Sequence, residues 1–198
     1  LAQFANVTRM SQDKFSNLGS TIVDLGNNFA TTEADIVSMG SRLVGAGAQV
    51  GMTEPQILSY AAALSSVGIE AEAGGTAFST LMSNMQLAVE AGGESLTQFA
   101  EVAGMSAEQF QQAFREDAAG AILSFIEGLS TCEERGMSAI SVLDQMGLSD
   151  VRMRDALLRA AGASDVFAQA LETGTTAWDE NIALTNEAGK RYATTASQ

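Results

Sequence analysis

Residue types that carry chemistry are scarce in this chain of 198 residues: histidine is absent, and cysteine and proline occur once each. The commonest general base and metal ligand is therefore missing. A single cysteine excludes an internal disulfide, and without histidine to activate Cys132 we expect a buried or half-buried apolar side chain there. Because 46% of the residues are apolar, we expect the chain to fold, into one or two domains at this length.

Basic residues are also few, which excludes a common class of partner. Ten Lys and Arg stand against 24 Asp and Glu, giving a net charge of -14 and a pI near 4.2. A phosphate backbone is repelled by such a charge, so we expect no direct nucleic-acid binding. The densest basic cluster, Arg152, Arg154 and Arg159, is interleaved with Asp150 and Asp155, a spacing typical of ion pairs on a solvated helix face.

Long apolar runs are missing as well. The longest, residues 118–126, contains Gly and Ser and ends at Glu127, short of the roughly 18 residues that a membrane helix needs. The chain begins Leu-Ala-Gln-Phe, with neither an initiator Met nor a basic region followed by an apolar stretch, so we expect no secretory signal. Its end stops without a clear helix terminator, and we expect a segment of a longer protein.

What the chain does contain is a repeated tripeptide motif, Gly-Met/Leu-Ser/Thr. It occurs at residues 51–53, 104–106, 136–138 and 147–149. Gly suits the left-handed residue that ends one helix, Ser or Thr caps the next, and the Met or Leu between them sits at the hydrophobic staple position. The residues four positions after each cap are all apolar: Ile57, Phe110, Val142 and Met153. The motif therefore predicts tight helix-to-helix corners.

Two of these corners carry a further helix-start signal. Thr53 with Gln56 and Ser106 with Gln109 have the spacing of capping boxes, and Pro55 falls in the first turn, where its missing N–H is harmless.

Apolar spacing predicts helices along the whole chain. We expect them at residues 12–29, 32–50, 53–67, 75–91, 96–103, 106–129 with a division near Asp117 or Gly120, 138–146, 150–161, 165–173, and from about 176 onward. No window alternates in polarity as a strand would. We predict an all-α fold, a compact array of short helices joined by tight glycine corners. It comprises an N-terminal helical arm (1–30), a helical core module (31–174) and a C-terminal helical arm (175–198).

The first arm has an apolar seam at three- and four-residue spacing, formed by Phe15, Leu18, Ile22, Leu25 and Phe29. A coiled coil stays open as an alternative, although the seam covers only about two heptads. We place the centre of the core at Phe110, Phe114 and Phe125, the largest aromatic concentration. Small residues at Gly40, Gly47 and 61–63 predict close helix approach.

The nine methionines are expected to fill the core and the corners. An alternative hypothesis assigns Met39, Met82 and Met85 to an adaptable partner surface.

Motifs for chemistry are weak. The glycines of Gly45-Ala-Gly47-Ala-Gln-Val-Gly51 lie late in a predicted helix rather than after a strand, so helix packing is favoured over a nucleotide loop. Acidic residues are paired closely in sequence in three places, at 70/72, 116/117 and 133/134, but glycoside hydrolysis needs two carboxyls held across a cleft. Acids in first helical turns favour the helix dipole instead. We predict no catalytic, cofactor-binding or metal-ligating residue.

Three segments have distinctive sequences: Thr32-Glu-Ala-Asp-Ile-Val-Ser-Met-Gly-Ser-Arg-Leu, Gly51-Met-Thr-Glu-Pro-Gln-Ile-Leu, and Leu64-Ser-Ser-Val-Gly-Ile-Glu-Ala-Glu-Ala-Gly-Gly-Thr-Ala-Phe-Ser. A similar sequence pattern continues through Leu96-Thr-Gln-Phe-Ala-Glu-Val-Ala-Gly-Met-Ser, then to Leu148, Leu157 and the Trp178 helix. Over nearly its whole length the chain resembles the core region of the phage tail tape measure protein family.

The resemblance implies a long helical protein inside the tube of a long-tailed phage, whose overall length sets tail length during assembly. It implies several copies running together, and contacts with tail tube, tail tip and tail assembly chaperone proteins. The expected location is the lumen of the virion tail, after synthesis in the bacterial host cytoplasm. Some relatives carry peptidoglycan-cutting domains, and nothing in this chain matches one.

Three hypotheses follow. The leading one is a structural, non-enzymatic module of a phage or prophage tail. The second is a membrane-active helical module that assists genome delivery, suggested by the Ala/Gly-rich segments around Ala61 and Ala118 and opposed by the acidity of the chain. The third, an enzyme that uses paired acids, has no constellation of residues to support it.

Overall fold

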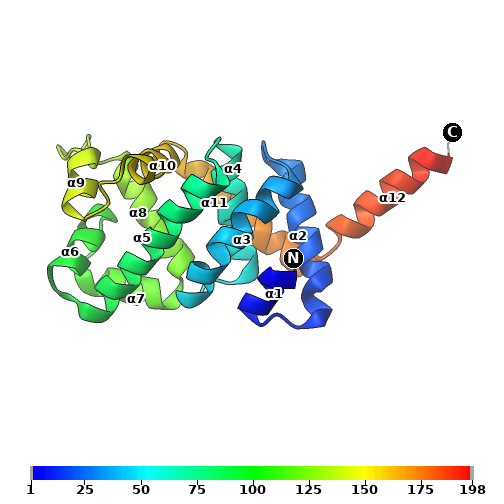
Figure 1. The fold of residues 1–198 in the computed structure, drawn as a ribbon, viewed down its shortest axis with the longest axis horizontal. Coiled ribbons are helices and arrows are strands. Elements are labelled where there is room, and N and C mark those ends of the chain that lie inside the picture. Colours follow the sequence, from blue (N-terminus) through cyan, green and yellow to red (C-terminus); the bar gives the residue numbers. More distant parts are fainter. Residues whose placement is uncertain (1, 197–198) are drawn as a thin grey trace.

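A computed structural model describes residues 2–196 of the chain, and the side chains of residues 2–190. This part contains twelve α-helices, one short 3₁₀ helix and no strand, which confirms the predicted all-α fold (Figure 1). The elements are α1 (Ala2–Thr8), the 3₁₀ helix (Gln12–Lys14), α2 (Phe15–Asn28), α3 (Glu33–Gln49), α4 (Glu54–Ser66), α5 (Ala71–Ala91), α6 (Gly93–Val102), α7 (Ala107–Glu116), α8 (Ala118–Ser130), α9 (Ala139–Gln145), α10 (Val151–Ala161), α11 (Ser164–Glu180) and α12 (Ala183–Ala196).

Three of the four predicted helix-to-helix corners are confirmed, and at the third Gly136 ends a turn over residues 131–136 instead of a helix, because α8 already ends at Ser130. Gly51, Gly104, Gly136 and Gly147 all have φ between 71° and 85°, the left-handed region that glycine enters without strain. At the first corner the N–H of Gly51 donates to the carbonyl of Ala48 (3.2 Å) and the N–H of Met52 to that of Gly47 (2.9 Å). This is the Schellman arrangement, which satisfies carbonyls at the end of α3. A fifth corner, at Gly68 (φ 73°), closes in the same way through Ile69.

The residues that begin the next helices are mostly those predicted. The N–H of Thr53 donates to Gln56 Oε1 at 2.9 Å, and Ser106 and Gln109 complete a reciprocal capping box. The fourth corner is a correction, because Asp150 and not Ser149 caps α10. Its Oδ1 accepts the N–H groups of Arg152 and Met153. A carboxylate serves this position well since it also faces the positive end of the helix dipole.

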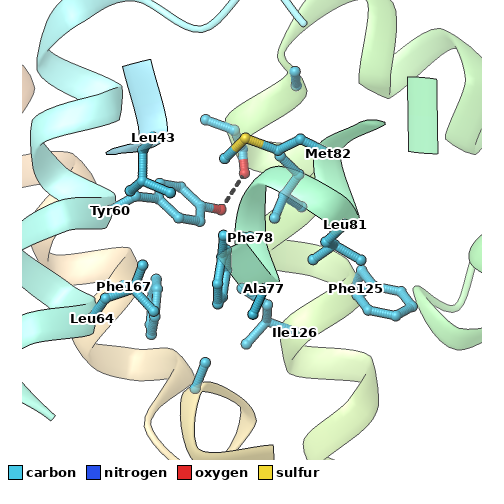
Figure 2. Packing of buried hydrophobic residues seen from close by; sticks show 14 of the residues in the cluster. Leu43, Tyr60, Leu64, Ala77, Phe78, Leu81, Met82, Phe125, Ile126 and Phe167 are labelled. Carbon is cyan, nitrogen blue, oxygen red and sulfur yellow. Dashed lines mark hydrogen bonds between the residues drawn. The ribbon is translucent and has the colours of Figure 1, made fainter. Parts of the chain in front are cut away.

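Two aromatic clusters occupy the core. Phe110, Phe114 and Phe125 are buried as predicted, and with Phe99 they form one cluster. The second was not predicted: Tyr60, Phe78 and Phe167 meet with ring centroids 5.4–6.0 Å apart (Figure 2). Its rings come from α4, α5 and α11, so this cluster joins segments more than 100 residues apart.

Several glycines inside helices mark places where two helices nearly touch. A Cβ at Gly75 would lie 2.6 Å from Arg42 Cβ, so α5 passes directly over α3. The prediction began this helix near Gly75, whereas α5 begins at Ala71. The predicted close approach at Gly47 is confirmed, because a Cβ there would lie 2.8 Å from Ile57 Cγ1.

The last helices differ from the prediction. We expected one helix to end at about 173 and another to begin at about 176, but α11 continues through Gly174 to Glu180. Gly174 lies against Ser59 and the carbonyl of Pro55, so its missing side chain admits α4 instead of ending the helix. The true break is Asn181, with a left-handed φ of 51°. After it, α12 leaves the body at the end of the long axis opposite α6 and α9 (Figure 1).

The division into a core and two arms stays a prediction. Its second boundary, at 174/175, falls inside α11. In the first segment, Leu18, Ile22 and Leu25 of α2 belong to the continuous buried cluster, while Phe15 is exposed. Tyr192, within the last predicted helix, lies outside the residues whose side chains are described.

Candidate contact surfaces

The acidic pairs considered for catalysis lie at the surface. Glu116, Asp117, Glu133 and Glu134 are all exposed, on or beside helix ends. Among the described residues, no group of three or more Asp, Glu or Cys side chains is arranged to hold a metal ion. The third pair, Glu70 and Glu72, lines a surface cavity of about 520 Å³ together with Asp150 and Arg152.

That cavity is one end of a groove between the start of α5 and α10. An adjoining cavity of about 350 Å³ shares Glu70, Ala73 and Arg152 with it. Small side chains from both helices form part of the lining, and Val151, whose side chain is 70% exposed, stands beside it. We refer to this feature, whose lining residues come from the segments 68–77 and 150–159, as the α5/α10 groove. It is an open surface feature lined by both apolar and charged residues.

Arg159 ties the two sides of this groove together. Its guanidinium donates to the carbonyl of Gly68 at 3.2 Å, at the fifth glycine corner, and to Asp155 Oδ2 at 2.9 Å. The pair with Asp155 is one of the i,i+4 pairs predicted from the sequence. Arg159 belongs to the basic cluster on α10. Its hydrogen bonds hold the corner before α5 in place, and it does not form part of an anion-binding patch.

Arg135 has a structural role that the sequence did not reveal. Its guanidinium donates to the carbonyls of Glu101 (3.1 Å), Val102 (2.9 Å) and Gly128 (2.6 Å). These carbonyls lie at the carboxyl ends of α6 and α8, where a cation is favoured. A Cβ at Gly128 would collide with the carbonyl of Val102, so the two helices come very close there. The sequence did not reveal this role because two of the partners of Arg135, Glu101 and Val102, are more than 30 residues away.

A second surface hollow, of about 260 Å³, lies between α6 and α9. Its apolar lining comprises Val102, Met137, Val142 and Met146, and Ile140 on α9 is exposed. Further exposed apolar side chains, Phe15, Ile182 and Leu184, lie on α2 and near the start of α12. These faces are apolar surfaces open to contact with another protein.

Other predicted residues lie in the core. Cys132 is buried and unpaired, as expected. The hypothesis that Met39, Met82 and Met85 form a partner surface is wrong, because all three are fully buried (Met82 in Figure 2). The residues 61–63 and most of 118–126, which suggested the membrane-active hypothesis, are also buried. None of the described helices combines the length and the apolarity required to cross a membrane.

The comparisons with known proteins define the class. Residues 1–139, which make up most of the chain, match the family of phage-related minor tail proteins. The chain therefore belongs to this family and has a structural role in a phage tail. The matched region ends at the first residue of α9. Searches of curated proteins and of solved structures returned no match.

Proposed function

We propose that this chain is a structural module of a phage or prophage tail tape measure protein, acting in tail assembly and length determination through helix-mediated protein contacts. The family match supports a role in the tail. The resemblance of residues 32–79 and 96–106 to tape measure proteins supports the tape measure assignment. The observation that carries the proposal is the combination of this family with an all-helical body whose acids lie dispersed on the surface.

The proposed partners are other copies of this chain and the tail tube, tail tip and tail assembly chaperone proteins, within the lumen of the virion tail. The α5/α10 groove and the exposed apolar residues on α2, α9 and α12 are the candidate faces. Cross-linking of assembled tails, followed by mass spectrometry, tests this. Cross-links from residues 68–77 or 150–159 to tube subunits or to a second copy are expected, and their confinement to pairs within one copy would contradict it.

The module's own share in setting length is small in this proposal. A continuous helix of 198 residues would span roughly 300 Å at about 1.5 Å per residue, whereas short helices folded against one another cover far less. An in-frame deletion of the module from the full gene is expected to block assembly or to shorten tails by much less than that span, as measured by electron microscopy. Tails of normal length and number would contradict the assignment.

The module is proposed to be non-enzymatic. Incubation of the purified chain with cell-wall polymer is expected to release no product. Hydrolysis that disappeared on a single carboxylate substitution, such as Glu72→Gln, would overturn this part of the proposal.

A further inference from the structure

The junction between α11 and α12 is held by side chains that are distant in sequence. Asn181 Oδ1 accepts hydrogen bonds from the hydroxyls of Ser16 and Ser20, each at 3.0 Å. Ser20 Oγ in turn accepts the N–H of Leu184 at 3.4 Å. Asn17 Nδ2 donates to the carbonyl of Trp178 at 2.7 Å. Four hydrogen bonds thus connect α2 with residues more than 160 positions later in the chain.

These bonds satisfy backbone groups that a helix leaves unpaired. The last carbonyls of α11 and the first N–H groups of α12 have no partner within their own helices. The carbonyl of Trp178 and the N–H of Leu184 are such groups, and α2 supplies a partner to each. Ser20 is fully buried, so its bonds are shielded from competing water.

Apolar packing does little to hold α12 farther along. Leu184 contacts α2, where a Cβ at Gly19 would lie 3.3 Å from its Cδ2. Beyond it, residues 185, 186 and 188–190 are all exposed, and the helix extends away from the body (Figure 1). The link between α11 and α12 is only two residues long, and Asn181 holds it in the left-handed conformation.

We infer that Ser16, Asn17, Ser20 and Asn181 form a hydrogen-bonded clasp that fixes the direction in which the C-terminal helix leaves the body. The clasp joins α2, inside the family-matched region, to a junction outside it. It converts α12 from a loosely attached tail into an arm of defined orientation. A force or contact on α12 is thereby passed to α2 and α11 instead of being absorbed by a flexible hinge.

Pulsed electron-spin distance measurements test this directly. The parent protein carries Cys132→Ala, with spin labels attached at Gln49→Cys on the body and Ala188→Cys on α12, both exposed positions. The clasp predicts one narrow distance peak. Ser16→Ala/Ser20→Ala, and separately Asn181→Gly, are expected to lose that single peak in favour of a broad distribution. Asn181→Gly allows the left-handed backbone but also frees it, so the serine double variant is the test of the hydrogen bonds alone.

Two controls keep the outcome interpretable. Asn181→Asp retains the acceptor oxygen and is expected to keep the narrow peak. Asn27 is an exposed asparagine of α2, and Asn27→Ala is also expected to keep the narrow peak. Circular dichroism and the thermal midpoint show whether each variant keeps its folded body. A parent distribution as broad as that of the variants, or a narrow peak that survives in folded Ser16→Ala/Ser20→Ala and Asn181→Gly proteins, would overturn the inference.

Discussion

At the scale of single residues, Tyr60 combines two constraints. Its ring packs in the second aromatic cluster, and its hydroxyl donates to the carbonyl of Ala119 at 2.8 Å (Figure 2). We expect Tyr60→Phe to lower the free energy of unfolding by about 1 kcal/mol, the usual net worth of one hydrogen bond, as measured by urea denaturation. An unchanged or higher stability would show that the hydroxyl is not held as described.

The same side chain gives the fold an alkaline limit. Burial, with smaller contributions from Asp117 and Glu127, raises the pKa of Tyr60 well above its usual 10.0. A pKa raised in the folded state stabilises the fold below the unfolded pKa, and that contribution is lost as pH rises above 10.0 through the folded value. Stability measured against pH should therefore fall less steeply above 10.0 in Tyr60→Phe than in the parent. Parallel curves for the two proteins would contradict this.

Two glycines in helices should respond oppositely to the same substitution. An added Cβ at Gly128 meets the backbone carbonyl of Val102, which cannot rotate away, so Gly128→Ala should destabilise the protein by about 1–3 kcal/mol or more. Gly45 in α3 has nothing within 4 Å of an added Cβ, so Gly45→Ala should stabilise it by up to about 1 kcal/mol. Thermal denaturation of both variants checks the pair, and equal signs would contradict the packing of α6 against α8.

At the scale of elements, the start of α10 separates two candidate caps. Asp150→Ala removes the acceptor for two backbone N–H groups and should cost about 0.5–2 kcal/mol, while Ser149→Ala should change stability little. Chemical denaturation of both variants measures this. A larger loss from Ser149→Ala would restore the cap expected from the sequence.

Local signals predicted the elements best. The corners at Gly51, Gly104 and Gly147 follow from short-range rules about helix ends, and the structure has them where they were expected. Glycine was misread where it serves a distant contact. Gly174 resembled a helix end because nothing nearby in sequence shows that Ser59 lies against it. The clasp at Asn181 and the role of Arg135 were missed for the same reason, since their partners come from other elements.

At the scale of the whole molecule, the folded body extends beyond the family-matched residues. α10 and α11 follow residue 139, yet Leu157 and Phe167 lie in the same buried cluster as Tyr60 and Phe78. A truncated chain of residues 1–139 lacks Leu157 and Phe167. It should therefore expose the rings of Tyr60 and Phe78 and fail to unfold cooperatively. A chain of residues 1–182 should keep a cooperative transition, as measured by circular dichroism. A cooperative 1–139 fragment of full stability would contradict a single shared core.

The central claim is that the apolar faces of these short helices close within one chain, leaving a structural module whose contacts are made by its surface. Amide hydrogen exchange of the purified chain, followed across a wide range of protein concentration, tests it most directly. The account predicts that α4, α5 and α8 exchange slowest, at rates independent of concentration. Protection of these helices that appears only as concentration rises would show that their apolar faces close between chains, and would contradict the account.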